Sequence, residues 1–240
     1  MNLPQRLLIS ATTLLCASTA TVSAQAKKVQ FRTLCLEHVQ GITEVALVPT
    51  KAEEPGVAVP LYTASISQVI ETTFATGSAV FTKGTGADGK PTVVATAPLA
   101  KGTRQLFVFV PAKAGSKTPY DILAFDDDTD TFKLGSIRAI NLAPTPVRFV
   151  ISGATTPQIP ATKHALFPQS AKKDDYNMYP AKVEFLSGDG KWFNAYSASW
   201  KANEDRREVV ITLIDDKFKQ PTVKIYPDIP PWTEVPPATP

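Results

Sequence analysis

Cysteine and histidine are scarce in this sequence of 240 residues, which contains two of each. Cys16 lies in the apolar N-terminal stretch, so Cys35 is the one cysteine in the rest of the chain. A lone cysteine forms no internal disulfide, and together with two histidines it makes a poor ligand set for structural zinc, which takes four nitrogen and sulfur ligands. We therefore expect a fold held by apolar packing, and we expect no cofactor.

The common motifs of enzymes and nucleotide-binding proteins are also missing. The sequence has no G-x-S-x-G, H-E-x-x-H, Walker or Rossmann pattern. The segment KGTGADGK at 83–90 resembles a phosphate loop only at a glance, because it lacks the Ser or Thr after Gly-Lys and lies between two expected strands. Basic residues do not gather into blocks of the nucleic-acid-binding kind. The sequence indicates a protein that is not an enzyme and has no nucleic-acid partner.

The first 26 residues have the layout of a secretory signal peptide. Arg6 precedes an apolar stretch at 7–17, and two A-x-A-like cleavage sites follow at 22–26. The apolar stretch is too short to cross a bilayer, and the sequence has no second long apolar run. We expect cleavage after Ala26, a secreted or periplasmic location, and no membrane span in the mature protein.

The rest of the chain consists of short β-branched and aromatic runs between turn residues. RQLFVFVP (104–111), PVRFVI (146–151) and REVVITLI (207–214) are too short for typical helices. The whole sequence also contains 21 prolines, which oppose long helices. The runs recur about every ten to fifteen residues, as in antiparallel sandwiches. The sequence therefore predicts an all-β protein.

Five segments of the chain resemble five later segments, in the same order and 101 to 106 positions apart. The pairs are 31–36 with 137–142, 45–48 with 147–150, 80–90 with 184–191, 103–110 with 206–213, and 121–125 with 222–226. Each unit has about the length of one immunoglobulin-like domain. We predict two tandem antiparallel β-sandwich domains, at 27–132 and 133–229, each with its own core. A proline-rich disordered tail is expected at 230–240.

An acidic run, FDDDTD at 125–130, lies where the chain leaves the first unit. Asp126, Asp128 and Asp130 fit the first, third and fifth positions of an EF-hand calcium loop. However, Thr131 replaces the required glycine and Ile137 replaces the final glutamate. A solvated turn explains the run better, since aspartate favours tight backbone conformations. A calcium ion bound between the two domains is the alternative, with these three aspartates as ligands.

Large aromatic residues gather in the second unit, in KWFNAYSASW at 191–200. Side chains alternate between the two faces of a strand, so Trp192, Tyr196 and Trp200 share one face. Three rings on one face can stack on a sugar, but such rings more often pack as the inner face of a sandwich. These three residues are the candidate ligand-binding site.

The segment GSIRAINLAPTPVRFVISG at 135–153 resembles a module of bacterial secreted proteins of unknown function, in which a strand ending in Asn-Leu-(Ser/Ala)-Pro precedes a strand closed by a glycine turn. FDDDTDTFKLGS upstream, and Trp200 with Arg207 and the apolar run after it downstream, extend the similarity. The resemblance implies β-sandwiches of envelope or surface proteins, with no catalytic residues. We therefore expect a binding or envelope-assembly module with an envelope protein or a glycan as partner. A carbohydrate-binding module using the aromatic residues of the second domain is the alternative.

Overall fold

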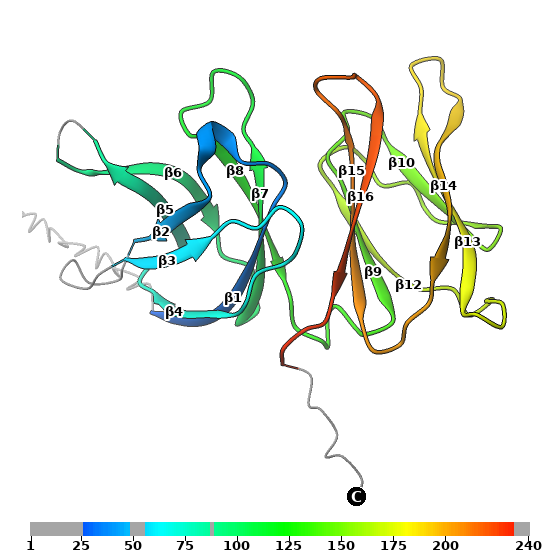
Figure 1. The fold of residues 1–240 in the computed structure, drawn as a ribbon, viewed down its shortest axis with the longest axis horizontal. Helices are drawn as coiled ribbons and strands as arrows, with labels where there is room; N and C mark the ends of the chain where they lie inside the picture. The colour runs from blue at the N-terminus through cyan, green and yellow to red at the C-terminus, as the bar shows by residue number, and fades with distance from the viewer. Residues whose placement is uncertain (1–25, 49–55, 87–88, 233–240) are drawn as a thin grey trace, which may run out of the picture.

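The computed structural model describes residues 26–48, 56–86 and 89–232. Its regular structure in these ranges is β-strand, apart from one 3-10 turn at Val39–Gly41. The strands form four sheets that make two sandwich-like halves lying side by side (Figure 1). The prediction of an all-β protein with two sandwiches is confirmed.

Eight strands of the described residues form the first half and eight form the second. In the first half they are β1 (Lys27–Cys35), β2 (Glu44–Leu47), β3 (Val57–Pro60), β4 (Ile70–Phe74), β5 (Ser78–Thr85), β6 (Pro91–Pro98), β7 (Arg104–Pro111) and β8 (Tyr120–Asp126). In the second half they are β9 (Ser136–Asn141), β10 (Val147–Ile151), β11 (Ala154–Thr155), β12 (His164–Pro168), β13 (Met178–Leu186), β14 (Trp192–Lys201), β15 (Arg207–Ile214) and β16 (Pro221–Asp228).

The two halves repeat one strand order. The sheets are β4-β1-β7-β8 and β3-β2-β5-β6 in the first half, and β12-β9-β15-β16 and β11-β10-β13-β14 in the second. Each strand of the first half thus has its counterpart eight strands later, and all five repeated sequence segments lie on such counterparts. One pair in each half, β1 with β7 and β9 with β15, is parallel, which the purely antiparallel prediction missed.

Each half has its own apolar core, as the sequence predicts. Phe31, Phe81 and Phe107 lie at the centre of the first core, and Phe149, Val183 and Val210 at the centre of the second.

A third core, which the sequence analysis did not predict, lies between the halves. It consists of the buried residues Leu34, Leu36, Leu106, Val108, Phe125, Phe132, Ile140, Val209, Ile211 and Tyr226. In LFVFV of β7, Phe107 points into the first core and its neighbours Leu106 and Val108 point into the third. An unbroken apolar run of this kind is typical of a strand buried on both faces. The sheets containing β7 and β15 therefore pack against each other, and the molecule has four layers (Figure 1).

Two sequence predictions concern the ends of the chain. Residues 1–25 of the expected signal peptide lie outside the described residues, as do residues 233–240 of the expected tail. In the part that the structure describes, no helix has the length and apolar character needed to cross a membrane.

Candidate functional site at the junction of the two halves

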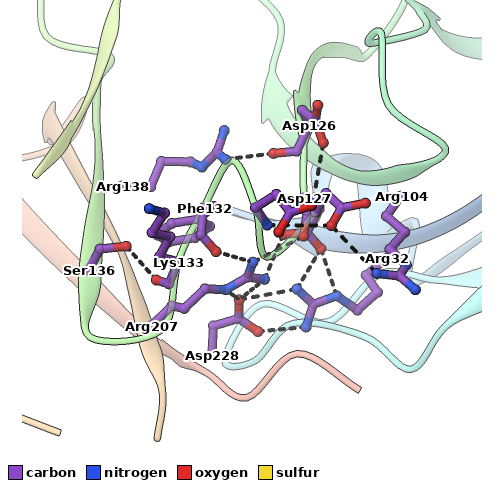
Figure 2. Close-up of polar contacts among 12 residues, drawn as sticks. Arg32, Arg104, Asp126, Asp127, Phe132, Lys133, Ser136, Arg138, Arg207 and Asp228 are labelled. Carbon is purple, nitrogen blue, oxygen red and sulfur yellow. Dashed lines mark hydrogen bonds and ion pairs between the residues drawn. The ribbon is translucent and has the colours of Figure 1, made fainter. Parts of the chain in front are cut away.

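Two arginines and two aspartates meet in the buried space between the halves, and we call them the junction cluster (Figure 2). Arg32 comes from the middle of β1, and Asp127 follows directly after β8. Arg207 and Asp228 are register partners at the ends of β15 and β16. All four side chains are at most 3% exposed. Each half therefore contributes one arginine and one aspartate.

Each carboxylate in the junction cluster is bound by both guanidinium groups. Asp127 accepts from Arg32 Nη2 at 2.6 Å and from Arg207 Nη2 at 2.7 Å, through different oxygens. Asp228 accepts from Arg32 Nη1 at 2.6 Å and from Arg207 Nε at 2.8 Å. Arg207 Nη1 also donates to the backbone carbonyls of Asp127 and Phe132 at 3.0 and 2.9 Å. Hydrogen bonds therefore cross the junction from both sides.

The two carboxyl groups of the junction cluster have different acidities. Burial opposes ionisation of Asp228, but hydrogen bonds and charge from Arg32 and Arg207 outweigh it and hold the pKa of this carboxyl below its usual value. Burial raises the pKa of Asp127 against the effect of the same arginines, and the charge of Asp228 adds to the increase. The pKa values of two carboxyl groups that share a site move apart in this way, because the charge of the first group disfavours ionisation of the second.

Phe132, from the connection between β8 and β9, also supports the junction cluster. Its fully buried ring lies between two guanidinium groups, 4.2 Å from Arg207 and 4.6 Å from Arg138, measured to the ring centroid. Arg138 of β9 also donates to the backbone carbonyl of Asp126 at 2.6 Å. Burial lowers the pKa of Arg138 to about 10. Aromatic faces attract such partly desolvated cations, so Phe132 stabilises both arginines.

Trp232, a residue of the expected disordered tail, packs its ring against the junction cluster. Its ring lies 4.8 Å from the guanidinium of Arg32 and 5.5 Å from that of Arg104. The chain therefore packs onto the first half again after it leaves β16.

The junction cluster links the two halves of the molecule. Its carboxylate oxygens are occupied by guanidinium donors and are closed off from solvent. Opening the junction would leave these charges without partners or would require them to be hydrated again, while the third core beside them lost its contacts. The junction cluster and the third core together make the two halves one body.

The three aspartates predicted as metal ligands, unlike their neighbour Asp127, are not part of the junction cluster. Asp126 Oδ1 accepts from the backbone N–H of Asp128 at 3.1 Å, which is an Asx turn. Asp128 forms an ion pair with Arg104 at 3.5 Å, and Asp130 is exposed. Among the described residues, no group of three or more His, Cys, Asp or Glu side chains could hold a metal ion. The turn accounts for these contacts, and calcium binding stays a prediction.

Asp127 is the residue of the acidic run that does not fit a ligand position of the EF-hand pattern. A signal for it was present in the repeat, because Asp127 follows β8 as Asp228 ends β16, at the exit of each half. In the sequence, its partner Arg207 stands out only as part of a strand pattern. Nothing in the spacing of these residues shows that they meet, because the junction brings together positions 80 residues apart.

The prediction that Trp192, Tyr196 and Trp200 share one face is wrong. Between Val183 and Glu184 the register with β14 shifts by one residue, a β-bulge that flips the faces before and after it. Tyr196 and Trp200 point into the second core, and Trp200 is 5% exposed.

Trp192 lies on the outer face of the same sheet. Its ring is 4.3 Å from the guanidinium of Arg148, which also pairs with Glu184 at 2.7 Å. The three rings therefore form no common platform, and ligand binding by any of them stays a prediction.

Comparison with known proteins adds no relative, since no protein-family model and no curated protein matches the chain. The resemblance of residues 135–153 to a bacterial secreted module stays a prediction from the sequence.

Proposed function

We propose that this protein is an exported, non-enzymatic module for binding or envelope assembly, and that its two halves act as one rigid body. The observation that carries this proposal is the junction cluster, in which both arginines bind both aspartates across the halves. Two domains joined only by a linker usually move relative to each other, whereas a large apolar interface prevents this. The combination of a third core with a buried ionic link favours a scaffold that holds its outer surfaces in a fixed arrangement.

The surfaces available to a partner lie away from the junction. The two sheets without third-core residues, β3-β2-β5-β6 and β11-β10-β13-β14, are the outermost layers of the molecule (Figure 1). Sandwiches commonly bind through end loops and sheet edges while the packed interior stays fixed. An envelope protein is the partner we expect, and the separation of the three aromatic rings removes the main argument for a sugar platform.

Two measurements test the proposal. Mass spectrometry of the protein from an envelope or culture fraction should find an N-terminus at Lys27, and an uncleaved chain in the cytosol would contradict export. Photo-crosslinkers placed at exposed Phe193 and Val93 on the outer sheets should capture a partner in the cell. The purified partner should then bind the purified protein saturably. If neither crosslinking nor a glycan array yields a saturable ligand, the binding role is wrong.

A further inference from the structure

The two halves repeat the same β-bulge but differ beside it. In β6 the bulge lies between the partners of Phe81 and Thr82, and in β14 between the partners of Val183 and Glu184. The residue that follows the bulge and faces the core is Ala95 in the first half and Tyr196 in the second. A methyl group in one half therefore corresponds to a phenol ring in the other.

The larger side chain accompanies an open corner in the second half. In the first half β6 and β8 run close together, and Ala95 and Ala97 are fully buried. In the second half β14 and β16 approach each other at few positions. Several core-facing residues on these two strands are only half-buried there: Tyr196, Ala198, Val223 and Ile225. The second core is thus less covered between β14 and β16 than the first core is between β6 and β8.

β14 is also the least protected edge strand of the described residues. It has ten residues, no proline, and one charged residue, Lys201, at its end. Edge strands in natural proteins are usually short or carry proline or charge, because a free edge pairs with other strands. The other edges follow that rule: β3, β6, β12 and β16 contain proline, β11 has two residues, β4 carries Glu71 paired with Lys28, and β8 carries two aspartates.

The backbone of β14 presents hydrogen-bonding groups at this edge. The N–H of Ala202 donates to Asn177 at the end of the β13–β14 ladder. Bonded and non-bonded pairs alternate in an antiparallel ladder, so the backbone groups of Ala198 and Trp200 point to β13. Those of Ser197 and Ser199 point to the free edge, where no backbone hydrogen bond to them occurs among the described residues.

We propose that β14 is a docking edge for an extended segment of a partner protein, which adds as a strand beside β14 and covers the open side of the second core. The inference rests on the proposed binding role and names its site. Main-chain hydrogen bonds to Ser197 and Ser199 supply affinity, and alternate side chains facing Tyr196 and Val223 supply specificity. The open side is lined by apolar side chains, so the segment has apolar residues at every second position. It contains no proline, because proline cannot donate a main-chain hydrogen bond to the edge.

A peptide selection tests this docking edge. A displayed library of random nine-residue peptides is selected on the mature protein, and the selected peptides should show alternating apolar residues. Ser199→Pro removes a free-edge N–H without taking a bond from β13, and it should weaken binding at least about tenfold, the equivalent of one lost hydrogen bond. The matched variant Ser199→Ala keeps the N–H and should bind like the original protein.

A measurement on the unaltered protein makes the test independent of the variants. Addition of a selected peptide should slow hydrogen exchange at the amides of Ser197 and Ser199, and binding without this protection would overturn the proposal. Failure to select any peptide would also overturn the proposal. So would protection of these amides by self-association, because the edge would then bind a second copy of the chain. If the crosslinked partner binds Ser199→Pro with unchanged affinity, the docking edge is wrong while the binding role stands.

Discussion

Asp127 and Asp228 hold equivalent places at the exits of the two halves, yet the same two arginines bind both carboxylates. Burying four charges costs hydration free energy, and ion pairs in a protein interior often recover little more than that cost. The geometry does impose a requirement, because the four groups satisfy one another only when the halves dock in one orientation. The junction cluster therefore sets the arrangement of the halves more than it adds to stability.

Removing one charge from the junction cluster should be costly. In Asp127→Asn, two buried guanidinium groups lose a carboxylate, and we expect the free energy of unfolding to fall by about 3–5 kcal/mol. Urea denaturation measures the change. Asp130→Asn, an exposed member of the same acidic run, is the matched control and should change stability by less than about 0.5 kcal/mol. Equal effects of the two variants would show that the ionic link is not formed.

Stability should decrease in acid through Asp228. Because the folded state holds the pKa of this carboxyl below its unfolded value, the contribution of Asp228 is present above about pH 4 and is lost as the pH falls through the lower folded pKa. Asp127 has the opposite sign, since its raised pKa lets the folded state take up a proton first. Urea titrations between pH 7 and pH 2 should show the difference between the protein and Asp228→Asn shrinking below about pH 4. A constant difference would contradict the assignment.

Truncation in the third core should weaken both halves at once. Leu106 is fully buried between the halves, and Leu106→Ala should lower the free energy of unfolding by about 2–5 kcal/mol. Hydrogen exchange should accelerate in β15 of the second half as well as in β7. Leu134→Ala is the control, because the Leu134 side chain is partly exposed at 37%. Faster exchange confined to the first half would mean that the halves unfold independently.

Cys35 should not react in the folded protein. The thiol is fully buried, burial raises its pKa, and Sγ donates to the carbonyl of Glu37 at 3.1 Å. A soluble aromatic disulfide reagent should modify the mature chain only at the rate of unfolding, and it should titrate one thiol in urea. Rapid reaction without denaturant would disprove the burial, and two thiols in urea would show that Cys16 had been retained.

The repeat was the most informative feature of the sequence, because similar segments in a constant order indicate that the two halves contain corresponding strands. It placed the five matched segments on counterpart strands and put Asp127 beside Asp228 in the alignment. The bulge in β14 was missed because one extra residue reverses side-chain direction without changing the composition of the strand. Strict alternation along the strand therefore predicts the wrong face for Trp192.

The sequence by itself determined the strands, their repeated order and the apolar side chains of each sandwich, because these depend on local pattern and on periodicity along a single strand. Only the tertiary structure decided that the two sandwiches share a third core, that Arg32 and Arg207 meet both aspartates, and that one corner of the second half stays open. Those features depend on which faces of distant strands come together. Packing between sheets selects that arrangement, and the pattern of any one strand does not encode it.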